Sequence, residues 1–89
     1  MIAIRIKVTG RVQGVFFRVS TKERADALGI KGWVKNELDG SVLIEAEGKV
    51  DQVNEFKQWC SIGPSAAMVE RITVEEIPLS KFPDFEIAY

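Results

Sequence analysis

The stretch from Gly10 to Arg18 combines the residue types that bind an anion. It reads Gly-Arg-Val-Gln-Gly-Val-Phe-Phe-Arg and lies between an alternating apolar pattern and a helical one. A turn that leads into a helix presents unpaired backbone N–H groups, and the helix dipole adds positive partial charge there. Glycine permits positive φ angles in such a loop, and the Arg18 guanidinium can contact two oxygens of one phosphate. The stretch is a candidate phosphate cradle, although a plain strand-to-helix turn with a solvated Arg18 explains it equally well.

A second group of interest is Asn36, at the end of Gly32-Trp33-Val34-Lys35-Asn36. Asparagine is unfavourable inside a strand, so its position needs a reason. One reason is local, because Asn36 could begin the turn that Asp39-Gly40 completes. The other is functional, because its side-chain amide could position a water molecule or a ligand beside the anion loop.

The elements that must position these residues follow from hydrophobic periodicity. Alternation of period two predicts strands, and a period near 3.6 predicts helices. Gly29 is placed to end the first helix in a left-handed conformation, and Asp39-Gly40 is a two-residue hairpin signal. The predicted elements are a strand at 2–9, a helix at 17–28, strands at 30–38 and 41–47, a helix at 49–60, a strand within 67–77 and a short last strand at 85–89.

This order predicts an α+β protein of the ferredoxin-like, split βαβ type, with two helices on one face of an antiparallel sheet. RNA-recognition modules of similar topology carry stacked aromatic residues on the free face of the sheet. Here the first strand offers Ala3, Arg5, Lys7 and Thr9 to that face, and the third offers Leu43, Glu45 and Glu47. No aromatic platform is present, so the sequence argues against RNA binding.

Length and composition predict one folded domain over residues 1–89. The net charge is −1 and the pI is about 5.4, which disfavours a nucleic-acid partner. Cys60 is the single cysteine, so no intrachain disulfide can form, and a cytoplasmic location is the expectation. The sequence shows neither a signal peptide nor a membrane span.

The chain has no histidine, which removes the usual general base and the commonest metal ligand. Glu45 and Glu47 share a strand face, and Glu70, Glu75 and Glu76 lie close in sequence. We interpret these carboxylates as a solvated acidic face rather than a metal site. Cys60 is interpreted as a small core residue.

Taken together, the two candidate groups resemble the acylphosphatase family, and the resemblance covers essentially the whole chain. Gly48, the Gly63-Pro64 segment and the terminal Phe85-x-Ile87-x-Tyr89 also match that family. The motifs that carry the resemblance are Gly10 to Arg18, Gly32-Trp33-Val34-Lys35-Asn36 and Asp39-Gly40-Ser41-Val42.

The resemblance implies hydrolysis of the carboxyl–phosphate bond of small acyl phosphates, without a metal, a cofactor or a phosphoenzyme. Arg18 matches the catalytic arginine of the family, and Asn36 matches its water-orienting asparagine. The role of Arg11 is left open. The phosphate-binding loop, which acts through backbone N–H groups, matches Gln13, Gly14, Val15, Phe16, Phe17 and Arg18.

The expected partners are a small acyl phosphate as substrate and inorganic phosphate as product and inhibitor, with no nucleic acid and no membrane, in a monomeric protein. The sequence departs from the family pattern at Ala88, where an arginine often precedes the last tyrosine, and at Ser65 and Ala66. A non-catalytic anion-binding or regulatory domain on the same fold is the alternative interpretation.

Overall fold

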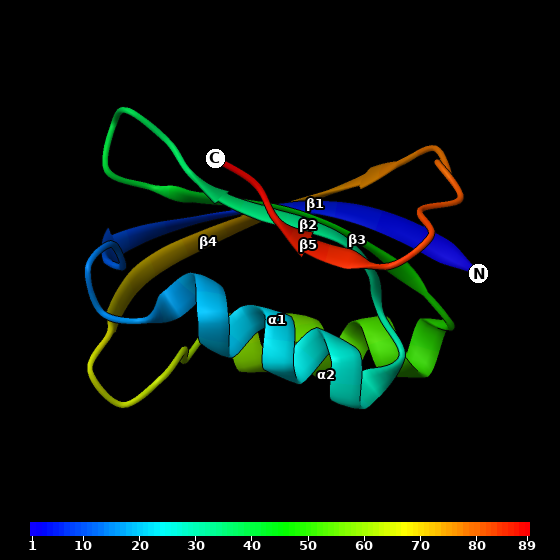
Figure 1. The fold of residues 1–89 in the computed structure, drawn as a ribbon, viewed down its shortest axis with the longest axis horizontal. Helices are drawn as coiled ribbons and strands as arrows, with labels where there is room; N and C mark the ends of the chain where they lie inside the picture. The colour runs from blue at the N-terminus through cyan, green and yellow to red at the C-terminus, as the bar shows by residue number, and fades with distance from the viewer.

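A five-stranded sheet with two helices on one face forms the molecule (Figure 1). The computed structural model describes residues 1–89. The order of strands across the sheet is β4-β1-β3-β2-β5. The elements in chain order are β1 (Ile2–Arg11), α1 (Phe17–Leu28), β2 (Lys31–Asn36), β3 (Val42–Gly48), α2 (Val50–Cys60), β4 (Met68–Ile77) and β5 (Phe85–Ile87).

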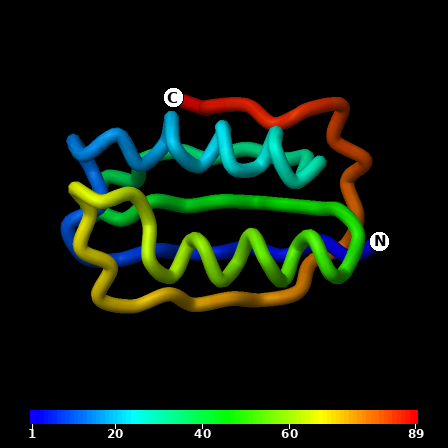
Figure 2. Tube along the Cα trace, turned by 90° about the horizontal axis from the view of Figure 1, so that it is seen from below, coloured from blue at the N-terminus to red at the C-terminus, as the bar shows by residue number.

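The predicted ferredoxin-like α+β fold is therefore confirmed, with one correction to the sheet. Strands β1 to β4 pair antiparallel, but β5 pairs parallel to β2. The connector after β4 crosses from one edge of the sheet to the other, so the last strand enters beside β2 in the same direction. Viewed from the helical side, α1 lies along β2 and β5, and α2 lies along β1 (Figure 2).

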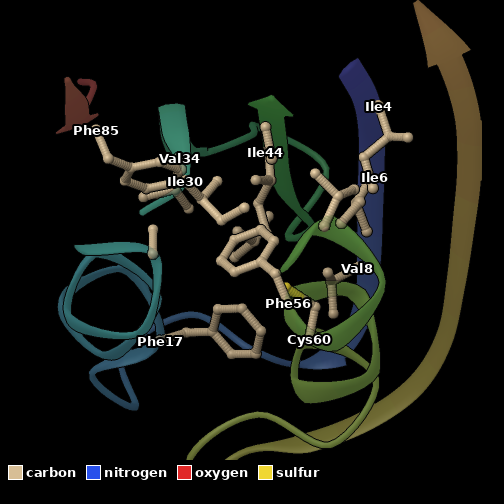
Figure 3. Packing of buried hydrophobic residues seen from close by; sticks show 14 of the residues in the cluster. Ile4, Ile6, Val8, Phe17, Ile30, Val34, Ile44, Phe56, Cys60 and Phe85 are labelled. Carbon is tan, nitrogen blue, oxygen red and sulfur yellow. The ribbon is translucent and has the colours of Figure 1, made fainter. Parts of the chain in front are cut away.

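Both helices bury the stripes that their periodicity predicts. Phe17, Thr21 and Ala25 of α1 are buried, and Gly29 ends that helix at φ 72° as expected. On α2 the buried residues are Val53, Phe56 and Cys60, at helical spacing, whereas Val50 at the first position of the helix is 47% exposed. Figure 3 shows Phe17, Phe56 and Cys60 meeting the sheet residues Val8 and Ile44 in one core.

The β2–β3 hairpin differs from the predicted two-residue turn. The Glu37 N–H donates to the Ser41 carbonyl at 2.8 Å, which leaves three residues, 38–40, in the loop. Gly40 has φ 93°, and a left-handed residue at the end of a three-residue loop is a common hairpin geometry. The Asp-Gly signal is compatible with both loop lengths, so the sequence could not separate them.

The interpretation of Glu47 as part of a solvated acidic face is wrong. Its side chain is 3% exposed, and its carboxylate accepts hydrogen bonds from the N–H groups of Ser80, Lys81 and Phe82. These bonds hold the β4–β5 connector over one end of the open face. Ala3 pairs with Glu47 in the sheet and is 1% exposed for the same reason, although alternation placed it on the free face.

The strand directions bring the two candidate groups to one end of the sheet. Strand β1 ends at Arg11 and the parallel β2 ends at Asn36, so the β1–α1 loop and the β2–β3 hairpin are neighbours. Figure 1 shows both connections at the same end, opposite the β4–β5 connector. We call these the loop end and the connector end of the sheet.

Candidate active site

The β1–α1 loop is anchored by three inward apolar residues and turns its backbone outward between them. Val12 and Phe17 are buried, and Val15 packs against the core. Gly14 has φ 73°, and Phe16 has φ 62° and ψ 23°. Alternating left-handed residues direct successive N–H groups toward a common point, an arrangement that binds anions.

The N–H groups of this loop have no acceptor within the protein. None of those from Gly14 to Val19 donates to a backbone or side-chain oxygen. Phe16 is the N-cap residue of α1 and gives no side-chain cap, and the first turn of the helix contains no acidic residue. Helices ordinarily satisfy these groups with a Ser, Thr, Asp or Asn cap, so this helix start remains able to receive an outside anion.

Arg18 lies in the first turn of α1, and its own N–H belongs to this run. Its guanidinium forms no ion pair and donates no hydrogen bond within the protein. It lies over the Tyr89 ring, whose centroid is 5.2 Å from Cζ. Arg5, in contrast, is already engaged by Glu45 and Glu75. The Arg18 charge is therefore available to a ligand at the loop.

Asn36 is the last residue of β2, and its side chain is unsatisfied. Oδ1 is buried and accepts no hydrogen bond. A buried polar atom without a partner is unusual in a folded protein and calls for an explanation such as a bound water or ligand. The local alternative, that Asn36 serves the turn, is not supported, because the turn is held by Glu37, Asp39 and Ser41.

Gln13 joins the loop to the hairpin that carries Asn36. Its Nε2 donates to the carbonyls of Glu37 and Ser41 at 2.8 and 2.9 Å. These two residues close the hairpin, and Glu37 directly follows Asn36. Sequence reasoning counted Gln13 only for its backbone, and no local pattern predicts a contact with residues 24 and 28 positions away.

A second set of contacts holds the loop of the hairpin through Asp39. Its carboxylate accepts hydrogen bonds from the Ser41 N–H and hydroxyl and forms an ion pair with Lys7 at 2.9 Å. The bonds from Ser41, followed by Lys7, hold the pKa of Asp39 well below its usual range. Lys7 of β1 and Gln13 of the loop that follows β1 thus both fix the hairpin.

The remaining cysteine, carboxylate and arginine side chains form no second site. Cys60 is buried in the core, and burial raises the pKa of its thiol, which makes it a poor nucleophile. No group of three or more Cys, Asp or Glu side chains has the arrangement of a metal site. Arg11 ends β1 beside Met68 and is exposed. Neither helix has the length and apolar composition that crossing a membrane requires.

Ala88, at the position where the family often has an arginine, is held by a backbone hydrogen bond. The Ala88 N–H donates to the Val34 carbonyl at 2.8 Å, which continues the pairing of β5 with β2. The following residue, Tyr89, thereby lies beside Arg18. This contact was not predicted, since alternation gives the face of Tyr89 but not its neighbour on another element.

Comparison with known proteins decides the family. The acylphosphatase family model matches residues 4–87. The chain belongs to the acylphosphatase family. An acylphosphatase of Rubrobacter xylanophilus is 53% identical over 77 residues, which are 86% of this chain and 70% of that protein. One of Marinobacter nauticus is 42% identical over 92% of this chain and 90% of that protein.

A solved acylphosphatase structure extends the similarity to three dimensions. The crystal structure of the Bacillus subtilis acylphosphatase is 40% identical, with a TM-score of 0.97 over the full length of both chains. The predicted family, ferredoxin-like fold and hydrolase class are confirmed. Membership of the acylphosphatase family also implies a small phosphate-containing substrate.

Proposed function

We propose that this acylphosphatase hydrolyses the carboxyl–phosphate bond of small acyl phosphates through the loop 13–18, Arg18 and Asn36. The observation that carries the proposal is the run of N–H groups from Gly14 to Val19 that have no acceptor in the protein. The loop N–H groups bind the phosphoryl oxygens, and the Arg18 guanidinium adds a full positive charge. Phosphoryl transfer requires mainly positioning and charge stabilisation, which these groups supply.

The leaving group explains how the reaction proceeds without histidine. A carboxylate has a reference pKa of about 4, so it departs as a stable anion and needs no general acid. An alkyl phosphate would release a much more basic alkoxide, and no suitable acid lies at the loop. We therefore expect turnover of acyl phosphates and little turnover of alkyl phosphates.

Asn36 is assigned to the attacking water. Its buried and unpartnered Oδ1 can accept a hydrogen bond from that water and hold it in line with phosphorus. No side-chain base is evident at the loop, so the water proton passes to a phosphoryl oxygen of the substrate. Gln13 fixes the position of this asparagine relative to the phosphate loop, because it bonds to the hairpin that carries Asn36.

The proposal includes a monomeric, cytoplasmic enzyme that consists of one domain over residues 1–89. It binds a small acyl phosphate as substrate and inorganic phosphate as product and inhibitor, and needs no metal or cofactor. Nucleic acid is not a partner in this proposal. The net charge of −1 and the pairing of Arg5 with Glu45 and Glu75 on the open face support this, because few free cations remain for phosphates there.

The test is hydrolysis of benzoyl phosphate in the presence of a chelator, with an alkyl phosphate as the comparison substrate. We expect turnover of benzoyl phosphate only, competitive inhibition by inorganic phosphate, and loss of turnover in folded Arg18→Ala and Asn36→Ala variants. Phosphate binding without turnover would contradict the proposal and indicate the non-catalytic anion-binding domain instead.

A further inference from the structure

Phe16 is an unusual residue for its position in the loop. It adopts a left-handed conformation with φ 62°, which disfavours a bulky side chain, and the residue is 78% exposed. Glycine or asparagine would adopt this backbone more easily, and neither would expose an aromatic ring to water. Two unfavourable features therefore coincide at one residue of the phosphate loop, and such coincidences concentrate at functional sites.

The exposed apolar side chains of the molecule are distributed unevenly. The element bounds place six of the ten large ones at the loop end, three at the connector end and one, Val74, within β4. Apolar side chains beside a binding site supply contacts for the apolar part of a ligand. The six at the loop end are Phe16, Val19, Leu38, Ile62, Met68 and Tyr89.

The chemistry of the substrate brings its acyl group to Phe16. The Phe16 N–H belongs to the run that binds the phosphoryl oxygens, at a hydrogen-bond distance of about 2.9 Å. In an acyl phosphate the carbonyl carbon is joined to phosphorus through a single oxygen. The acyl group therefore begins only a few covalent bonds from the Phe16 N–H, and the exposed side chain of that same residue is an aromatic ring. Arg18 and the N–H groups serve only the phosphoryl end.

We propose that Phe16 determines specificity by packing its ring against the acyl group, so that acyl phosphates with an apolar, and above all aromatic, acyl group are preferred. The proposal rests on the proposed function, since it names the residue that contacts the acyl end of the same substrate. An aromatic ring gives an aryl group a stacking or edge contact but gives a short or polar acyl group little to bind. The enzyme accordingly discriminates by hydrophobic contact beside the phosphate rather than by hydrogen bonds to the acyl group.

The test compares kcat/KM for benzoyl phosphate and acetyl phosphate in the parent and in Phe16→Gly, Phe16→Asn and Phe16→Leu. Gly and Asn keep the left-handed backbone accessible while they remove the ring. We expect the benzoyl-to-acetyl ratio to fall about tenfold in both, the range that a single apolar contact gives, with Phe16→Leu between them and the parent. The ratio cancels any change in phosphoryl binding common to the two substrates.

Lys81→Gly is the matched control, because Lys81 is the other non-glycine residue with positive φ and lies in the β4–β5 connector. Both glycine variants should raise the midpoint of urea unfolding, but only Phe16→Gly should change the substrate ratio. An unchanged ratio in Phe16→Gly and Phe16→Asn, with an active parent, would overturn the specificity role alone. A folded parent that hydrolyses neither substrate would contradict the proposed function itself.

Discussion

Two runs of backbone N–H groups lie at opposite ends of the sheet, and each contains a bulky residue with positive φ. At the connector end, Ser80, Lys81 and Phe82 donate to the Glu47 carboxylate at 2.9, 3.2 and 3.0 Å. At the loop end, the N–H groups from Gly14 to Val19 have no acceptor in the protein. A run of backbone N–H groups is thus bonded to a carboxylate of the protein itself at the connector end, whereas the run at the loop end has no partner in the protein.

The difference separates a structural site from a binding site. The internal carboxylate of Glu47 stabilises the connector at all times, since it is part of the chain. The loop end lacks an acidic residue in the first turn of α1 and has the free Arg18 guanidinium instead. Its N–H groups are therefore matched to an anion that arrives and leaves, as a substrate and a product must.

The largest expected effect is that of Arg18→Ala on catalysis. Removing the one full positive charge at the loop should lower kcat/KM for benzoyl phosphate about 1000-fold, which corresponds to about 4 kcal/mol of transition-state stabilisation. The free energy of unfolding should change little, because the Arg18 side chain forms no ion pair and no hydrogen bond within the protein. A loss of less than tenfold would remove Arg18 from the mechanism.

Glu47→Ala should produce the reverse pattern at the connector end. Three N–H groups lose a charged acceptor, so the free energy of unfolding should fall by about 3 kcal/mol in urea titrations. The Ki for phosphate of the folded variant should be unchanged. Glu47→Gln keeps one acceptor oxygen and should lose less. If Glu47→Ala abolished phosphate binding while folded, the two ends would not be independent.

Asn36→Ala should lower turnover at the loop end without weakening the binding of phosphate. Because Asn36 is assigned to the water rather than the phosphoryl group, kcat should fall about 100-fold while the Ki for phosphate stays within about twofold. Steady-state kinetics with phosphate as inhibitor measure both. Asn54→Ala, an exposed position on α2, is the control and should change neither. Equal losses in binding and turnover would refute the assignment.

Gln13→Ala tests the link between loop and hairpin. Loss of two hydrogen bonds to carbonyls should lower the free energy of unfolding by about 1–2 kcal/mol and kcat by about tenfold, because Asn36 is then less well held. Gln13→Glu should lose more, since it places acceptors against the two carbonyls. Gln58→Ala on the exposed side of α2 serves as the control. Full activity in Gln13→Ala would show that the link is dispensable.

The smallest effect is expected from Asp39→Asn, and it depends on pH. The pKa of Asp39 is lowered in the folded protein, chiefly by Ser41 and then by Lys7, so its charge stabilises the fold above the unfolded-state pKa of about 3.9. That contribution is lost as the pH falls below this value. Asp39→Asn should therefore flatten the acid-side loss of stability in urea titrations.

Local pattern predicted much of this molecule, and contacts between distant segments supplied the rest. Alternation and helical periodicity gave the elements, and Gly29 gave the end of α1, because these features depend on neighbours in sequence. The resemblance pointed to Arg18 and Asn36, and the structure then brought their elements to one end. The bonds of Gln13 to Glu37 and of Glu47 to Ser80 span 24 and 33 residues, and no periodicity reports such a contact.

The most direct test of the central claim is a titration with inorganic phosphate that follows the backbone N–H resonances by NMR. We predict saturable shifts for Gly14 to Val19 and none for Ser80 to Phe82, whose N–H groups are already bonded to Glu47. In Arg18→Ala the same resonances should shift only at a phosphate concentration at least about tenfold higher. Loop resonances that do not respond to phosphate, or that respond no more than those of the connector, would contradict the account.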